Sequence, residues 1–373
     1  MNNILTLTPP SRSQVAAPAT LSEESEAALR QLTLQRLMGY SVEYGDAGEL
    51  RKLVELGMPW KDAATAVAEQ HLARLKDSSR SLSAPSRRDL LIRTSALLRM
   101  SQMMMLRDSD ERREIYRHAA RLFLEAFTAD AACEKVSVDF RGKQMVGWFA
   151  GSGQSSAPSV LIIGGIEGWA MDLLSLGEAL ARRGINALLL DGPGQGETRF
   201  DHDHFLDENW PAAYSAAITF LIERTGGAPV GVLGNSVGGG VAMKLAAFDR
   251  RIAACCDNGG LRTPFTQRER KGFFPKVEAF CGAVPPDRVE SIWRTVEITP
   301  DSLSMACPLL IAHGGLDPLV SVGDVTEFLA SARSTDKQLR IFADGDHCIY
   351  NHPADKHDLI GDWFLDRLGK PRS

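Results

Sequence analysis

The pattern of apolar and polar residues changes character once along the chain. From residue 21 to about residue 130, apolar positions recur at helical spacing and β-branched residues are sparse. Leu29, Leu32, Leu34 and Leu37, for example, keep the near-helical spacing of an amphipathic helix. We therefore predict a helical domain over residues 21–130, preceded by a disordered tail over residues 1–20.

Beyond residue 131, short apolar runs alternate with helical stretches. KVSVDFRGKQMVGWFA alternates apolar and polar residues and turns at Gly142, which predicts a hairpin. Six strand-like runs follow, namely SVLIIGG, INALLLDG, PVGVLGNS, RIAACCDN, CPLLIAHGG and QLRIFADG. Strands that alternate with helices indicate an α/β domain, here over residues 131–373, with a mostly parallel sheet covered on both faces. Residues 261–304 lack a strand pattern, so we expect a helical insertion there.

Length, charge and cysteine usage narrow the class of protein. The 373 residues favour two domains. The net charge of −5, with 42 basic and 47 acidic residues intermixed, argues against a nucleic-acid partner. No run reaches the roughly 20 apolar residues that span a bilayer, and the N-terminus lacks the pattern of a signal peptide. The six cysteines show no CxxC or zinc-finger spacing, which predicts reduced thiols, no metal site and a cytoplasmic location.

One strand-like run ends in a glycine-flanked serine. Gly234-Asn235-Ser236-Val237-Gly238 lies between a strand-like run and a helix-compatible stretch. Glycines at such a junction can simply let a helix pack close to a strand. The same Gly-x-Ser-x-Gly pattern in this context also forms a sharp turn that exposes a serine nucleophile.

A serine nucleophile needs a base, and the base needs a group that orients it. Asp317 and His347 follow Ser236 in the chain, and each lies just past a predicted strand. Parallel strands bring their carboxyl ends to one edge of the sheet. Alone, Asp317 is an ordinary turn aspartate and His347 an ordinary loop histidine. Their order and their successive strand ends together predict a Ser236-Asp317-His347 triad.

Acyl transfer also needs two backbone donors for the tetrahedral oxyanion. The N–H of Val237, at the start of the predicted helix, is one candidate. The N–H of Ile166, in the loop after Gly164-Gly165, is the other. Glu167 follows in that loop, either as a solvated carboxylate or as an acid that faces the substrate.

The run LLLDGPGQGET, Leu188 to Thr198, holds three glycines and a proline. No Gly-Lys-Ser/Thr follows, so the run is not a phosphate-binding loop. Its composition favours a rigid structural loop beside the site, in which Asp191 and Glu197 form local hydrogen bonds.

Five motifs occur together and in order: GGIEGW, LLLDGPGQGET, GNSVGGG, HGGLDPLV and DGDHC. This set resembles the α/β-hydrolases related to 2,6-dihydroxypseudooxynicotine hydrolase, with the FrsA-like esterases as more distant relatives. DGPGQGE is the most specific of the five. The resemblance covers residues 130–370, and the helical part resembles the cap domain of that family.

The resemblance implies a homodimeric enzyme with its active site between cap and core. It also implies cleavage of a carbon–carbon bond next to a ketone, as in polyketide-shortening enzymes of secondary metabolism. The family glutamate of the Gly-Gly-x-Glu motif matches Glu167 and assists the substrate. The chain departs from the commonest motif at Gly168-Trp169, where Trp169 is expected to narrow the pocket or stack on an aromatic substrate.

The sequence thus predicts a serine hydrolase that cleaves a β-diketone, aryl ketone or polyketide-like substrate through an acyl-enzyme on Ser236. It needs neither a metal nor an organic cofactor, and His347 or Glu167 protonates the departing carbon. Met104 in the cap and Phe273 in the insertion are candidate substrate contacts, although both suit a helix core as well. The same triad also serves a carboxylesterase, a thioesterase, or an acyl transferase or cyclase. A non-catalytic regulator is the alternative from another class.

Overall fold

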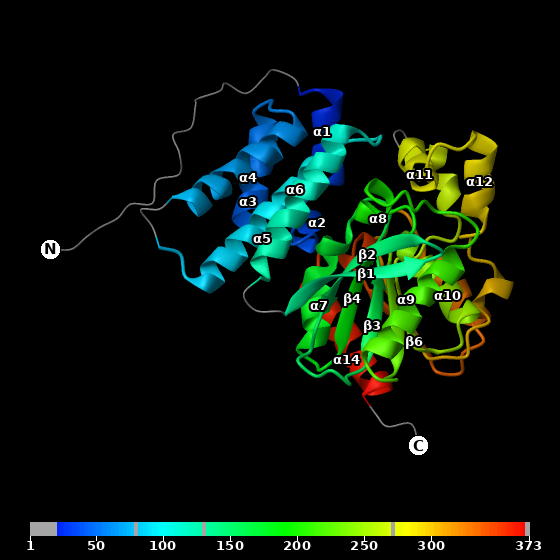
Figure 1. Ribbon diagram of the computed structural model, residues 1–373. Coiled ribbons are helices and arrows are strands. Elements are labelled where there is room, and N and C mark those ends of the chain that lie inside the picture. Colours follow the sequence, from blue (N-terminus) through cyan, green and yellow to red (C-terminus); the bar gives the residue numbers. More distant parts are fainter. Residues whose placement is uncertain (1–20, 78–80, 129–131, 270–272, 370–373) are drawn as a thin grey trace.

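The computed structural model describes residues 21–77, 81–128, 132–269 and 273–369. The predicted tail over residues 1–20 lies outside these ranges. The N-terminal region is helical, as its spacing predicts (Figure 1). Its helices are α1 (Glu23–Gln31), α2 (Leu34–Gly39), α3 (Tyr44–Glu55), α4 (Trp60–Lys76), α5 (Ala84–Ser101) and α6 (Asp110–Ala126).

Helix α2 is short, and its two ends are fixed by different means. The Thr33 side chain accepts a hydrogen bond from the Arg36 N–H and so caps the first turn. At the other end Gly39 lies against Tyr350, because a Cβ on Gly39 would be 2.3 Å from a ring carbon of Tyr350. Only glycine permits so close an approach, which brings α2 directly onto the sheet domain.

The sheet has eight strands in the order β1-β2-β4-β3-β5-β6-β7-β8. The β1/β2 and β2/β4 pairs are antiparallel, and the other pairs are parallel. The predicted hairpin is present, since Arg141 and Gly142 both have positive φ angles in the turn between β1 and β2. The strands are β1 (Cys133–Phe140), β2 (Lys143–Ala150), β3 (Ser159–Ile163), β4 (Asn186–Asp191), β5 (Val230–Asn235), β6 (Ile252–Asn258), β7 (Leu309–Gly314) and β8 (Lys337–Phe342).

Helices cover both faces of the sheet. Helices α7 (Leu174–Ala181) and α14 (Pro353–Leu368) pack on one face, and α9 (Trp210–Arg224), α10 (Val237–Phe248) and α13 (Val322–Ser331) lie on the other. Because side chains alternate along a strand, Ile162 belongs to the first core and Ile163 to the second. The N-terminal helices share the first core. No helix in the described ranges combines the length and the apolar character needed to cross a membrane.

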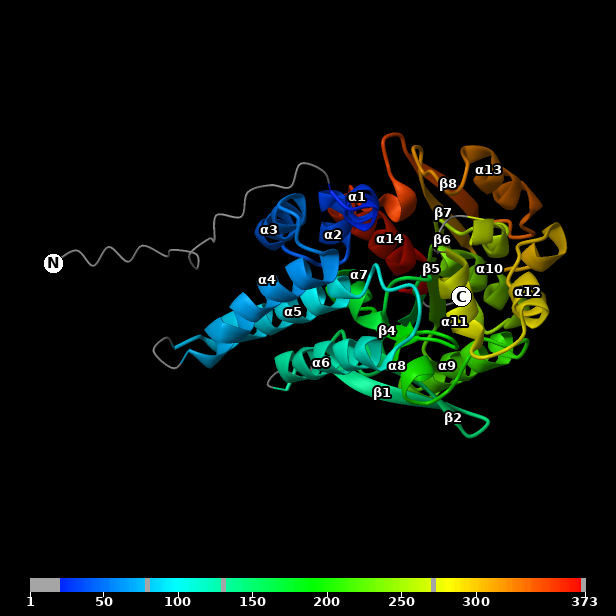
Figure 2. The ribbon, with the colours of Figure 1, turned by 90° about the horizontal axis from the view of Figure 1, so that it is seen from above.

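The segment between β6 and β7 is helical, as predicted for residues 261–304. It contains η2 (Pro264–Glu269), α11 (Phe273–Cys281), α12 (Pro286–Arg294) and η3 (Pro300–Leu303). Figure 2 shows α1 and α2 on one side of the central strands and α11 and α12 on the other. The carboxyl ends of the strands therefore lie between two helical segments.

Candidate active site

Ser236 occupies a strained turn between β5 and α10. Its φ of 56° and ψ of −128° lie in a region that L-residues seldom adopt. A Cβ on Gly234 would be 1.8 Å from the carbonyl oxygen of Gly238, and one on Gly238 would be 2.4 Å from that of Ile163. Both interpretations of the motif therefore hold, because the same glycines permit close packing and the turn that exposes the serine.

The structure brings Ser236, His347 and Asp317 together. His347 Nδ1 lies 2.8 Å from Asp317 Oδ2, and His347 Nε2 lies 2.9 Å from Ser236 Oγ. Because a carboxylate can only accept, Nδ1 carries a proton, and in the neutral imidazole Nε2 is then free to accept one from the serine hydroxyl. Asp317 also accepts hydrogen bonds from the N–H groups of Leu319 and Val320.

The surroundings of the histidine and the aspartate perturb both pKa values. Burial alone would raise the pKa of Asp317, but His347 and the two backbone donors hold it below its usual value. Burial alone would lower the pKa of His347, but Cys348 and the Asp317 carboxylate outweigh it and raise that pKa. The pair therefore favours an ionised aspartate beside a strongly basic imidazole.

The loop that carries His347 is itself strained and braced. Cys348 and Ile349 have φ angles of 58° and 54°. The carbonyl oxygen of Cys348 accepts hydrogen bonds from Asn258 Nδ2 at 3.2 Å and from Lys356 Nζ at 3.0 Å. Lys356 is buried, and burial lowers its pKa to about 8. Neither contact could be predicted from the sequence, because Asn258 and Lys356 belong to no motif.

Ser236 and His347 open onto a cavity of about 870 Å³. Ile166 and Val237, the predicted oxyanion donors, line it beside the serine. The predicted wall residues Met104 and Phe273 also line it. The cavity therefore lies between the sheet, the N-terminal helices and the insertion.

Trp169 does not line this cavity, which corrects its expected contact with the substrate. Its backbone N–H donates to Asp172 Oδ2 at 2.9 Å, and its side chain is only 3% exposed. The indole packs edge-on against Tyr116 of α6, with ring centroids 4.6 Å apart, and against Phe200. Its aromatic surface therefore joins the cap to the core.

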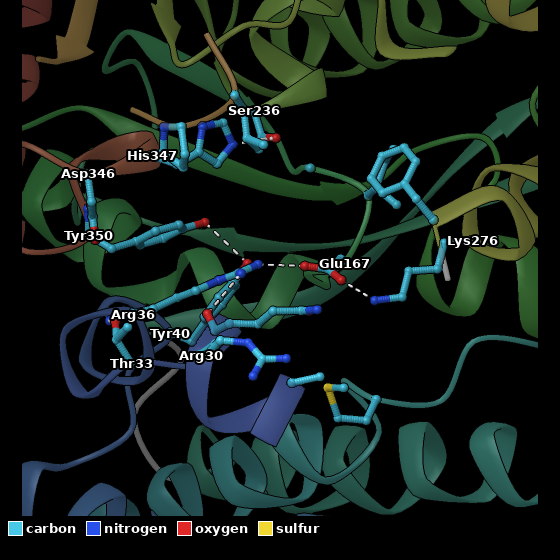
Figure 3. A pocket seen from close by; sticks show the side chains of 18 of the residues that line it. Arg30, Thr33, Arg36, Tyr40, Glu167, Ser236, Lys276, Asp346, His347 and Tyr350 are labelled. Carbon is cyan, nitrogen blue, oxygen red and sulfur yellow. Dashed lines mark hydrogen bonds and ion pairs between the residues drawn. The ribbon is translucent and has the colours of Figure 1, made fainter. Parts of the chain in front are cut away.

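Glu167 faces the cavity between two cations (Figure 3). Its Oε2 accepts a hydrogen bond from Arg36 Nη2 of α2 at 2.5 Å, and its Oε1 pairs with Lys276 Nζ of α11. Burial alone would raise the pKa of Glu167, but Lys276 and Arg36 lower it to about 2. Glu167 is therefore an ionised carboxylate that connects the sheet domain, the cap and the insertion, and it is not a solvated loop residue.

The DGPGQGET run forms a rigid loop that supports the cavity wall. Asp191 accepts hydrogen bonds from the Tyr116 hydroxyl at 2.7 Å and from the Ala170 N–H at 2.8 Å. Gln195 Nε2 donates to the carbonyl oxygen of Gly165 at 2.9 Å. The structural interpretation of this motif is therefore correct. Within the described part of the chain, no group of three or more His, Cys, Asp or Glu side chains is placed to hold a metal ion.

Comparisons with known proteins agree with this geometry. A sequence model of the Alpha/beta hydrolase family matches residues 151–356. The 2,6-dihydropseudooxynicotine hydrolase of Paenarthrobacter nicotinovorans is 32% identical over 230 residues, which are 58% of this chain and 59% of the relative. The match thus spans about three fifths of that relative.

Solved structures extend the similarity to the N-terminal helices. The crystal structure of 2,6-dihydroxy-pseudo-oxynicotine hydrolase matches with a TM-score of 0.77 and 25% identity, covering 91% of this chain and 98% of that one. AbyA5 matches at a TM-score of 0.68 and 18% identity, over 83% of this chain and 89% of its own, which shows the fold alone. Because the family model covers more than half of the chain, this protein belongs to the alpha/beta hydrolase family and is related to 2,6-dihydropseudooxynicotine hydrolase.

Proposed function

We propose that this protein is a serine hydrolase with Ser236 as nucleophile, His347 as general base and Asp317 as the group that orients the base. The observation that carries this proposal is the continuous hydrogen-bonded chain of the three side chains, which opens onto the cavity. His347 Nε2 takes the hydroxyl proton while Oγ attacks a carbonyl carbon. The N–H groups of Val237 and Ile166 then hold the oxyanion.

We further propose that the bond cleaved is a carbon–carbon bond next to a ketone. The relationship to an enzyme named as a 2,6-dihydropseudooxynicotine hydrolase supports this chemistry. The half-buried Met104 and Phe273 offer an apolar wall suited to a small aromatic or polyketide-like substrate. A homodimer, a cytoplasmic location and the absence of a cofactor remain predictions.

The ionisation state of Glu167 indicates which of the two expected groups, Glu167 or His347, protonates the departing carbon. A carboxyl group with a pKa of about 2 carries no proton at neutral pH. His347 has just received the serine proton and adjoins the reacting atoms. We therefore assign protonation of the departing carbon to His347, and to Glu167 the task of holding Arg36 and Lys276 in place.

The test compares the wild type with Ser236→Ala. We expect the variant to lose about 10⁵-fold in kcat on the β-diketone benzoylacetone and to lose all labelling by a fluorophosphonate. Ser137→Ala, an exposed serine on β1, is the matched control and should behave as the wild type. Near wild-type turnover by Ser236→Ala would refute the nucleophile. Hydrolysis of ethyl benzoate without cleavage of benzoylacetone would instead indicate an ester hydrolase.

A further inference from the structure

We propose that Lys276 and Arg36 form a cationic site that binds the enolate oxygen of the departing group. This inference rests on the proposed carbon–carbon cleavage and adds a second anion-binding site to the oxyanion donors at Ser236. It makes Lys276 and Arg36 determinants of which bond the enzyme cleaves.

The position of the two cations supports this assignment. Arg36 reaches the cavity from α2 and Lys276 from α11, and both line the same cavity as Ser236. Figure 3 shows Glu167 and its two partners across the cavity from Ser236 and His347. The acyl part of a substrate would lie at Ser236, and the departing part would extend toward the cations.

The charges of this cluster do not balance. Two cations share the single carboxylate of Glu167, and the Lys276 side chain is only 9% exposed. Tyr40 and Tyr350, beside Arg36, are neutral because burial raises the pKa of both phenols. An excess positive charge in a partly buried site is costly unless an anion compensates it. An ionised oxygen on the ligand would supply that charge.

Other charged groups on the cavity wall do not remove this excess. Glu23 and Glu24 are exposed, where solvent and salt screen their charge. Arg30 is cationic and pairs with Glu26 at 3.4 Å, and Asp346 lies on the His347 side. Asp346 accepts hydrogen bonds from the backbone N–H groups of Tyr350 and Asn351, which already compensate its charge.

Both cations also keep donors available. An ammonium group has three N–H donors, and Lys276 uses one on Glu167 and one on the carbonyl oxygen of Met103 at 3.3 Å. Arg36 donates from Nη2 to Glu167 and from Nη1 to the carbonyl oxygen of Gln31. A guanidinium group has five N–H donors, so each Nη group keeps a second N–H beyond these two bonds. Glu167 thus fixes the two cations without using all their donors.

The chemistry requires such a site only for a carbon leaving group. When the tetrahedral intermediate collapses, the C–C bond breaks and its electron pair passes to the departing carbon. In a β-diketone that pair delocalises onto the second carbonyl oxygen as an enolate, which the cations stabilise. The imidazolium of His347 then protonates the carbon, and water hydrolyses the acyl-enzyme to a carboxylic acid. An ester releases an alkoxide that His347 protonates directly.

Two substrates with the same acyl group test this site. Ethyl benzoate, and benzoylacetone attacked at its benzoyl carbonyl, both place a benzoyl group on Ser236, but they release an ethoxide and an enolate, respectively. We expect Lys276→Met to lower the ratio of their kcat/KM values about 100-fold, the scale of a lost charge-stabilising donor. Lys276→Arg should restore most of it. The control Lys52→Met, on the exposed face of α3, should leave the ratio as in the wild type. A ratio unchanged by Lys276→Met would overturn the proposal.

A binding measurement keeps this inference separate from the proposed reaction. Ser236→Ala protein is titrated by calorimetry with benzoate and with its neutral counterpart benzamide. We expect benzoate to bind about tenfold more tightly, and Lys276→Met or Arg36→Met to abolish that preference. Equal binding of benzoate and benzamide would refute an anion-binding site at Lys276 and Arg36, even if the wild type cleaves benzoylacetone. A preference for benzoate without such cleavage would support the site and contradict the reaction. Thermal unfolding and fluorophosphonate labelling of the single Lys276 variants verify that each is folded.

Discussion

Two groups of three side chains face each other across the cavity, and they are built in different ways. Ser236, Asp317 and His347 all follow strands of one sheet, and the three side chains belong to the sheet domain. Glu167 follows β3, but Arg36 comes from the cap and Lys276 from the insertion. The first group is thus inherent in the fold, whereas the second exists only when the helical segments are docked. We infer that the first supplies the reaction and the second its selectivity.

Loss of the base should have the largest effect and should affect every substrate. His347→Gln removes the acceptor of the serine proton, so we expect kcat to fall about 10⁴-fold or more on both benzoylacetone and ethyl benzoate. Steady-state kinetics on both substrates measures this. His352→Gln, at the partly exposed start of α14, is the matched control. Retained activity on either substrate in His347→Gln would show that the triad is not the common machinery.

Neutralising the carboxylate between the cations should separate the two substrates. Glu167→Gln keeps the shape of the side chain but leaves Arg36 and Lys276 without their counter-ion, so they should no longer hold their positions. We expect a loss of about 10- to 100-fold on benzoylacetone and a clearly smaller one on ethyl benzoate. Equal losses on the two substrates would mean that Glu167, Arg36 and Lys276 support the triad and do not distinguish between leaving groups.

The two groups should also respond differently to pH. His347 must be neutral to accept the serine proton, and its pKa lies above the usual 6.5. Activity should therefore fall as the pH drops through that raised pKa, by about tenfold per pH unit below it. Glu167, with a pKa of about 2, stays charged over the same range. A second inflection near pH 4.5 that disappears in Glu167→Gln would contradict this charge state.

The sequence was sufficient to predict the sheet and the convergence of Ser236, Asp317 and His347. Strands β3 to β7 are compact apolar runs. Ser236, Asp317 and His347 each lie just past a strand end, where local sequence and chain order restrict their positions. Gly234 and Gly238 were the strongest indication of the turn at Ser236, because a side chain at either position would clash with the backbone. Local patterns of this kind depend on neighbours in the chain and can be read without the structure.

The contacts between cap and core could not be read in this way. The partner of Glu167 in α2 lies 131 positions away, and no periodicity relates the two residues. Trp169 looked like a substrate contact from its motif, but the docked helix α6 covers it. The tight contact of Gly39 with Tyr350 likewise appears only once α2 is in place. The apolar pattern of an amphipathic helix indicates which face is buried, but not which residues that face contacts. These contacts could therefore not be predicted.

If the proposed reaction is correct, Ser236 accepts an acyl group when a carbon–carbon bond is cleaved. The most direct measurement is mass analysis of the protein after acid quenching during turnover of benzoylacetone. We predict a benzoyl or acetyl group on the peptide that contains Ser236, together with the matching ketone in solution, acetone for benzoyl and acetophenone for acetyl. Release of that ketone with no acyl group on Ser236, or with the acyl group on another residue, would contradict it.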